Sequence, residues 1–142
     1  MTQISNILKS WKEVVAADAD LTGALAGDLH HGERVDTSIV RPYGMITAKE
    51  IERETNSGYT ALVTYEVTLR IVGDQAVGDV GAIQGLFADA FTIGVDLPDV
   101  VGQVIAIDGG TAEIIEAAEQ EYSRDVLVGT QTWQLLILET GV

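Results

Sequence analysis

The sequence predicts an α+β fold over residues 1–142: an antiparallel sheet of about four strands, built as two hairpins, with an N-terminal helical arm and one central helix on one face. Three observations predict this class. Residues 59–72 alternate apolar and polar side chains, which is typical of a half-buried strand. Apolar residues recur at helical spacing in residues 4–17 and again in residues 77–91. Further strand patterns follow near the C-terminus.

The size and composition favour one domain that folds without covalent cross-links. A chain of 142 residues is long enough to bury a single core. It contains no cysteine, which excludes disulfides and thiolate metal sites and agrees with a reducing compartment. The N-terminal residues lack the pattern of a signal peptide, and no apolar run approaches the roughly 20 residues that span a bilayer. We therefore expect a protein that is not exported and does not bind membranes.

Charge is the outlying property. The chain has 22 acidic and 8 basic residues, and from residue 71 onward the only base is Arg124. Such a surface repels phosphate backbones, so we expect no tight grip on nucleic acid. Two interpretations stay open: solubility, including adaptation to a saline environment, and a surface past which nucleic acid slides without sticking.

The first 26 residues predict a helical arm. Residues 4–17 form an amphipathic helix with Ser5 as a candidate N-cap, and Trp11 belongs to its apolar stripe. The sequence Asp-Ala-Asp at 18–20 breaks this helix and caps a second one over residues 21–26, which Gly27 ends.

Residues 29–43 are mostly polar and predict an exposed connection, with at most a short strand over residues 29–31. His30 and His31 are the only histidines. Neighbouring strand residues point to opposite faces, and no cysteine or third histidine is present to complete a zinc site. We expect no bound metal.

The first hairpin pairs a strand that begins at Tyr43 with residues 59–72. Asn-Ser-Gly at 56–58 predicts its tip. The run over residues 47–55 holds three acids and two bases, and we interpret it as the outer end of the first strand. Such a run is either a solvated face or a contact with another subunit, because alternating charge along an edge also selects partners.

Over residues 77–91 the apolar residues recur every three or four positions. This spacing predicts a helix that covers the sheet, with Asp74 or Asp79 as its cap. Its glycines, which would allow close packing, do not form a phosphate loop, because no lysine follows them. Residues 100–107 predict a strand that ends in a tight turn at 108–110, where the sequence is Asp-Gly-Gly.

Local propensity over residues 111–122 favours a helix, but the turn before it and the strand after it favour an extended segment, and we predict a strand. The final strand covers residues 126–138, with Gly129 as a candidate bulge.

No catalytic motif is present. The carboxylates do not occur in a recognisable catalytic setting, and no GxSxG sequence exists. Asp96, Asp99 and Asp108 offer oxygen ligands for a divalent cation, but EF-hand spacing is absent. We expect no enzyme activity, no cofactor and no metal.

The layout resembles that of the tail-completion or tail-terminator proteins of long-tailed bacteriophages and gene transfer agents. The resemblance spans nearly the whole chain. It depends on the opening helix with its break at 17–21, on Gly27 and Gly32 before a loop, on Pro42-Tyr43 entering a strand, and on the strand, helix and late Trp133 that follow.

The resemblance implies a virion structural protein: a subunit of a ring, often six-fold, that caps the tail tube and joins the tail to the head. Its partners would be other copies of itself, the tail tube protein and a head-completion or neck protein. DNA would pass through the ring without specific binding. The chain would lie in the virion tail or neck, and in the host cytoplasm before assembly.

Charge suggests where such a ring would make its contacts. We expect the subunit interface at the charged hairpin, with acids facing bases such as Arg34, Arg41 or Arg70 of a neighbour. The candidate interface residues are Glu50, Glu52, Arg53, Glu54 and Arg70. The candidate acidic residues of the lumen are Asp96, Asp99 and Asp108.

Two alternatives remain. One is another neck, head-closure or baseplate ring subunit, which the sequence does not separate from a tail terminator. The other is a small ligand-binding or enzymatic α+β domain, for which the apolar face of residues 59–72 offers only the Tyr65 hydroxyl as a polar group.

Overall fold

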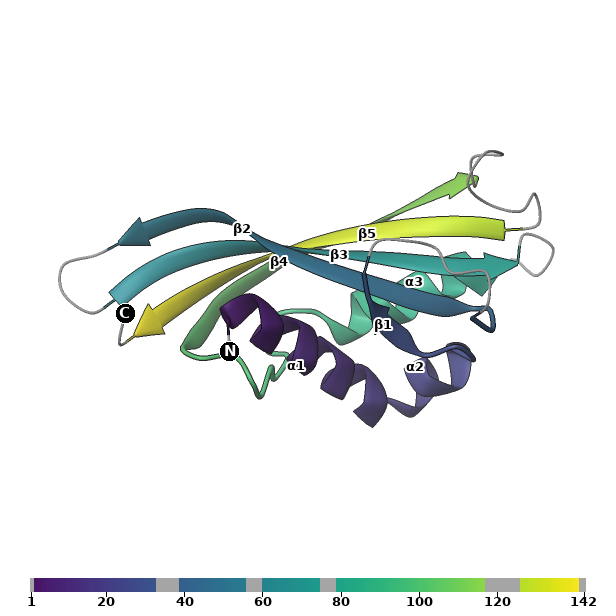
Figure 1. Ribbon diagram of the computed structural model, residues 1–142, viewed down its shortest axis with the longest axis horizontal. Helices are drawn as coiled ribbons and strands as arrows, with labels where there is room; N and C mark the ends of the chain where they lie inside the picture. The colour runs from purple at the N-terminus through teal and green to yellow at the C-terminus, as the bar shows by residue number, and fades with distance from the viewer. Residues whose placement is uncertain (1, 33–38, 56–59, 75–78, 117–125, 141–142) are drawn as a thin grey trace.

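The computed structural model describes residues 2–32, 39–55, 60–74, 79–116 and 126–140. They form two layers, a mixed five-stranded sheet and three helices that all lie on one face of it (Figure 1). The helices are α1 (Gln3–Ala17), α2 (Ala19–Ala24) and α3 (Asp79–Ala90). The strands are β1 (Leu29–His31), β2 (Tyr43–Thr55), β3 (Thr60–Asp74), β4 (Gln103–Glu116) and β5 (Val126–Thr140).

The α+β class is confirmed, and the sheet has five strands where about four were predicted. The order is β1-β2-β3-β5-β4, so the two predicted hairpin pairs, β2–β3 and β4–β5, join through β3 and β5. The additional strand is β1, which pairs with β2 in parallel and makes the sheet mixed. Backbone bonds hold it there, since Gly27 N donates to the carbonyl of Pro42 and Gly44 N to that of Asp28.

The predicted helices form with shifted ends. The N-cap of α1 is Thr2, whose hydroxyl accepts from Ser5 N, so the assignment of Ser5 as the cap is wrong. Asp18 caps α2, as predicted, by accepting from the backbone N–H groups of Asp20 and Leu21. The predicted caps of α3, Asp74 and Asp79, have side chains outside the described set.

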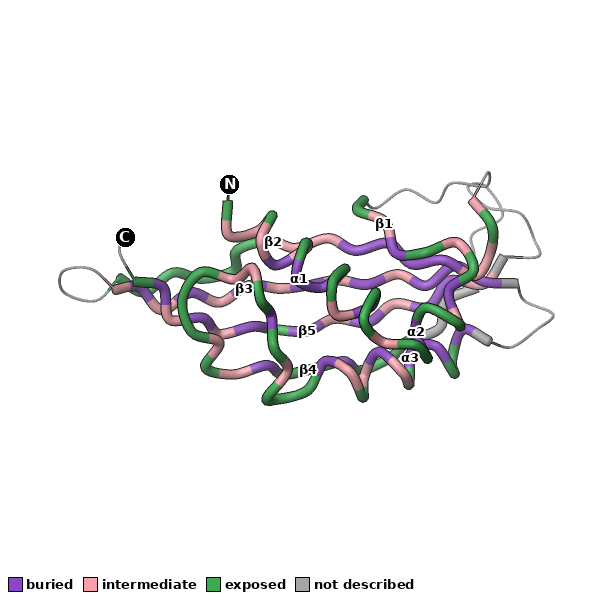
Figure 2. Tube along the Cα trace, turned by 90° about the horizontal axis from the view of Figure 1, so that it is seen from below, coloured by how far each residue is buried: buried purple, intermediate pink, exposed green. Residues whose placement is uncertain are grey.

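The main core lies between the helices and the sheet, and Figure 2 shows the buried positions alternating along the strands. Trp11 of α1 reaches its centre and contacts Phe91 and Trp133. A second, smaller cluster lies on the opposite face of the sheet: Tyr43, Met45, Val72 and Val128, with Ile39 packed against them. Burying aromatic side chains of this size is a major source of folding free energy.

Two predictions near the C-terminus are wrong. Residues 108–110 do not end a strand, because β4 continues through them, and its register with β5 shifts between Gly109 and Thr111. Positive φ angles of 114° at Gly109 and 78° at Gly110 make this bulge possible without a turn. Gly129 is no bulge. It keeps the β3 and β5 register, and its missing side chain leaves room for Val80 and Gln84 of α3.

The strand prediction for residues 111–122 is confirmed for residues 111–116, which belong to β4. The remaining residues of that segment, 117–122, and the predicted hairpin tip at 56–58 lie outside the described residues. Packing explains why the strand forms where local propensity favours a helix. Gln131 on β5 and Gln84 on α3 donate to the carbonyls of Gly110 and Glu113, which holds this part of β4 extended.

Candidate interaction surfaces

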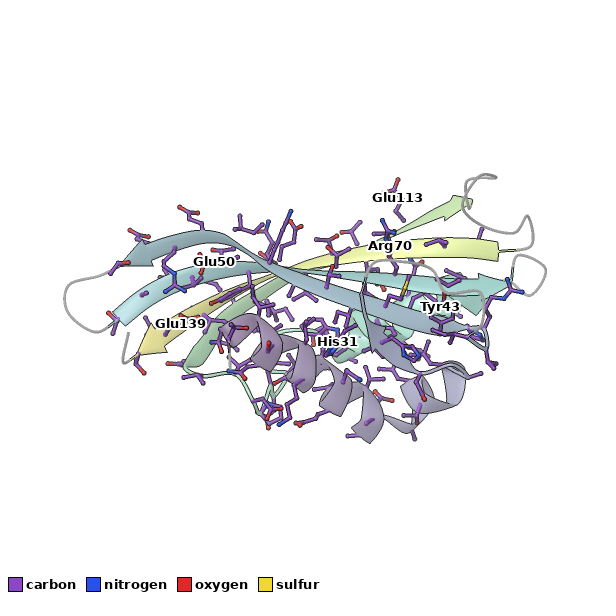
Figure 3. All side chains as sticks on the ribbon, in the orientation of Figure 1. His31, Tyr43, Glu50, Arg70, Glu113 and Glu139 are labelled. Atoms are coloured by element: carbon purple, nitrogen blue, oxygen red, sulfur yellow. The ribbon has the colours of Figure 1, made fainter. Side chains whose placement is uncertain are left out.

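One face of the sheet carries no helix in the described ranges, and we call it the outer face. Burial alternation and cross-strand register place its side chains in rows across β2, β3, β5 and β4. One row consists of threonines: Thr47, Thr68, Thr132 and Thr111. The next row is Lys49, Glu66, Gln134 and Asp108. Figure 3 shows Glu113 projecting from this side of the sheet. The middle of the outer face is therefore a broad polar surface.

Leucines occupy the outer face at the tip end of the sheet, meaning the end where β2 finishes at Thr55 and β3 begins at Thr60. Leu62 lies opposite Leu138, and Leu136 lies between Thr64 and Ala106. These leucines are neither fully buried nor part of either core cluster. The tip end thus presents an apolar strip beside the polar rows.

A charged cluster lies at the tip end on the helix side of the sheet. The Tyr65 hydroxyl donates to the carboxylate of Glu139, and Arg53 Nη2 lies 3.3 Å from the other oxygen of Glu139. Arg53 also bonds Glu50, at 2.7 Å from Nη2 and 3.0 Å from Nε. Burial raises the pKa of the Tyr65 hydroxyl, and its bond to Glu139 raises it further. Figure 3 shows Glu50 and Glu139 near the tip end.

This cluster joins three strands. Arg53 belongs to β2, Tyr65 to β3 and Glu139 to β5, and the Glu139 side chain is only 11% exposed. A carboxylate with so little contact with water needs charged and hydrogen-bonding partners, which Arg53 and Tyr65 supply. Strand alternation alone would have located Glu139, because it follows Leu135 and Ile137 on the core-facing side of β5.

The structure separates the candidate interface residues. Glu50 and Arg53 lie on the helix side and bond each other within one chain. Glu52 and Glu54 lie opposite Thr64 and Leu62, on the outer face, and are exposed. Arg70 is also on the outer face, but it lies opposite Met45, far along the strand from the tip end. A role for these residues between subunits stays a prediction.

The candidate lumen residues are also divided between faces. Asp99 lies beside α1, where its N–H donates to the Ser10 hydroxyl and its carboxylate lies 3.4 Å from Lys9 Nζ. Asp96 is in the same loop, and both lie on the helix side. Asp108 is on the outer face, opposite Gln134. One subunit therefore does not gather the three into a single acidic patch.

Two carboxylates meet beside α1. A hydrogen bond to Asp99 raises the pKa of Glu13, with burial and the negative charge of Asp99 acting in the same direction, while Lys9 opposes the shift. A shallow groove of about 620 Å³ runs along this region, between the end of α1 and residues 95–98. Within the described residues, no three acidic or histidine side chains are grouped to hold a metal ion.

The histidine pair has a structural setting. The His30 ring nitrogen Nε2 is hydrogen-bonded to the carbonyl of Gly27, which ties β1 to the end of the helical arm. His31 lies near Lys12, and burial, aided by the positive charge of Lys12, lowers the pKa of its ring. Of the helices in the described ranges, none has the length and apolar character needed to cross a membrane.

Comparison with known proteins finds similarity to solved structures. No family model and no curated protein matches the sequence. The fold is similar to that of a chain in the solved virion of a native gene transfer agent (GTA) particle, with a TM-score of 0.70 at 12% sequence identity. The similarity covers 95% of this chain and 97% of that chain. At this identity it shows a shared fold.

Proposed function

We propose that this chain is a structural subunit of a phage-type virion. The observation that carries the proposal is the shared fold with a chain of a gene transfer agent particle, which extends over nearly the full length of both chains. The proposal makes the chain a non-enzymatic component that needs no cofactor, located in the virion and, before assembly, in the host cytoplasm.

More specifically, we propose a tail terminator: a subunit of a ring, with six-fold symmetry expected, that caps the tail tube and joins the tail to the head. The resemblance stated from the sequence supports this choice, since the opening helix, the long hairpin, the covering helix and the late Trp133 resemble the layout of that family, and the structure contains these elements. Its partners would be further copies, the tail tube protein and a head-completion or neck protein.

The negative charge suits a ring through which DNA passes. With a net charge of −14, the chain disfavours lasting contact with phosphates, which would ease DNA movement through a central hole. Because Asp96 and Asp99 lie on a different face from Asp108, only one of these two groups is expected to line the hole. Asn variants made separately in the two groups would identify it through the rate of DNA delivery by assembled particles.

Electron microscopy of the purified protein at high concentration, with and without magnesium, tests the proposal. Rings with a central hole support it. Monomers that also fail to bind tail tubes and portal-bearing heads contradict it. Binding to tubes favours a terminator, whereas binding to heads favours a head-closure or other neck subunit. A ligand-dependent rise in melting temperature would instead support a small ligand-binding domain.

A further inference from the structure

Among the described residues, the sheet has two free edges on opposite sides. Figure 2 shows β2 along one side of the sheet and β4 along the other. β1 pairs only with residues 44–46 of β2, so residues 47–55 form an edge without a further strand in the described part of the chain. β4 pairs only with β5 there. Free edges are surfaces that proteins either protect or use for association.

Each edge carries an irregularity at the same height of the sheet. On β2 the register skips Ile51, between Glu50 and Glu52, which face Tyr65 and Thr64. On β4 the register skips Ile105, between residues that face Ile137 and Leu136. Since Thr64 pairs with Leu136 across the middle of the sheet, the two bulges lie within about one residue of the same level.

Both bulges present an isoleucine to solvent. Ile51 is 46% exposed and Ile105 is 43% exposed. Large apolar side chains at the two free edges, at matched heights, are unfavourable for an isolated chain because each adds apolar surface in contact with water. They become favourable if the two edges meet.

The charges next to the bulges are complementary. Lys49 on β2 and Asp108 on β4 stand at opposite ends of one row of the outer face, with Glu66 and Gln134 between them. The Lys49 side chain is 68% exposed and lies 3.5 Å from Glu66. Asp108 is exposed and has no ion-pair partner among the described residues. A second copy placed edge to edge at the same height would bring the two together.

We propose that residues 47–55 of one copy dock against β4 of a second copy, with Ile51 packing on Ile105 and Lys49 facing Asp108. The inference rests on the proposed function, because it assigns the contact between neighbouring ring subunits. β2 and β4 run in opposite directions, since three antiparallel pairings separate them, so the contact continues the antiparallel order. Each copy contributes one edge of each kind, so the contact is head-to-tail and forms a closed ring when the rotation between neighbouring copies closes.

The bulges also define the kind of contact. A bulge interrupts the regular row of edge hydrogen bonds, so side chains rather than a long backbone ladder make the contact. A symmetric contact of two β4 edges would place Asp108 and Glu113 of both copies in one contact, with no base on either strand to oppose them. The charges therefore favour the contact of unlike edges.

Cross-linking tests the pairing directly, because the chain has no cysteine of its own. The variants Ile51→Cys and Ile105→Cys are purified separately, given distinguishable tags, mixed at a concentration where wild type associates, and oxidised. We expect a disulfide-linked dimer with one copy of each variant, at least tenfold above either like-with-like dimer. The double variant should give a ladder of linked species that ends at the ring size.

Ile93→Cys is the matched control, because Ile93 is 78% exposed but lies in the loop after α3, on neither edge. It should not cross-link to Ile51→Cys. Lys49→Glu and Asp108→Lys should each raise the apparent dissociation constant roughly two- to tenfold, and the two changes combined should restore association.

Like-with-like dimers in excess, or no linked dimer in the mixture, would overturn the proposed contact. The same samples viewed by electron microscopy separate this failure from that of the proposed function. Rings that form without the mixed disulfide leave the virion role standing and refute the contact. Linked chains that never close into rings and bind neither tubes nor heads support the contact and refute the role.

Discussion

Trp11 on α1 and Phe91, directly after α3, lie face to face, with ring centroids 3.9 Å apart and ring planes 1° from parallel. Trp133 of β5 meets both rings edge-on, at 5.4 Å from Trp11 and 5.9 Å from Phe91. Three segments that are far apart in the sequence therefore share one aromatic contact. The cluster joins the helical arm to the end of α3 and to the sheet.

Trp11→Ala should lower the free energy of unfolding by about 3–5 kcal/mol, because it removes a fully buried ring and leaves a cavity. Urea denaturation monitored by circular dichroism would measure the loss. Ile93→Ala, at an exposed position, serves as the control and should change stability by less than about 0.5 kcal/mol. Equal effects of the two variants would show that α1 does not pack as described.

Tyr65→Phe should cost about 1–2 kcal/mol at neutral pH, because it removes the hydroxyl that donates to the poorly hydrated Glu139 carboxylate. The pKa of Tyr65 is raised in the folded state, so the folded chain holds this proton more tightly than the unfolded chain. Its contribution is complete below the unfolded pKa of about 10 and is lost as the pH rises above it.

Wild-type stability should consequently fall more steeply than that of Tyr65→Phe above about pH 10, by up to roughly 1.4 kcal/mol per pH unit. Denaturant titrations of both proteins between neutral pH and alkaline conditions would show curves that converge. Parallel curves would mean that Tyr65 titrates alike in the folded and unfolded states.

Two glycine substitutions should act in opposite directions. At Gly129 an added Cβ would lie 2.3 Å from Gln84 Nε2 and 2.6 Å from a Val80 methyl, so Gly129→Ala should destabilise by about 1–3 kcal/mol. At Gly85, on the exposed side of α3, no atom lies within 4 Å. Gly85→Ala should stabilise by about 0.5–1 kcal/mol through helix propensity. Thermal unfolding of both variants would measure this: the melting temperature should fall for Gly129→Ala and rise for Gly85→Ala.

Variants of two neighbouring residues at the tip end, Arg53 and Glu52, should have different effects on folding stability and on association between subunits. Arg53→Glu places a third carboxylate beside Glu50 and Glu139 and should cost roughly 1–2 kcal/mol of folding free energy. Glu52→Lys, on the exposed outer face, should leave folding nearly unchanged. Denaturation and sedimentation velocity would be measured on both variants. An effect of Glu52→Lys on association alone would support its predicted place at the interface.

The sequence predicted the elements whose pattern is set locally. The alternation of apolar and polar residues over 59–72 predicts β3, and apolar residues spaced three and four apart predict α1 and α3. Asp18 is predicted as a helix cap and is one. These features depend on side chains that are close in sequence, so their period reports the structure directly. The wrong assignments of Ser5 and Gly129 came from residues whose role is decided by what lies near them in the fold.

The remaining features depend on contacts between distant segments. A three-residue strand such as β1 has no period of its own, and its parallel place beside β2 follows from bonds to Pro42 and Asp28. The Asp-Gly-Gly sequence at 108–110 is compatible with a turn or a bulge, and packing under Trp133 and Gln131 decides between them. For the same reason, the matched heights of Ile51 and Ile105 appear only once the strand register is known.

The unbroken pairing of β3 with β5 has a mechanical consequence. All fifteen residues of β3, from Thr60 to Asp74, pair in register with β5, and the three register shifts of the sheet lie in the β2–β3 and β4–β5 pairings. A force along the strands would act in shear on all the β3–β5 hydrogen bonds at once. A force that peels β2 or β4 away would reach a bulge before it reached the β3–β5 pairing. When the subunit is pulled along its long axis, the β3–β5 pair should therefore resist extension more strongly than the edge strands do.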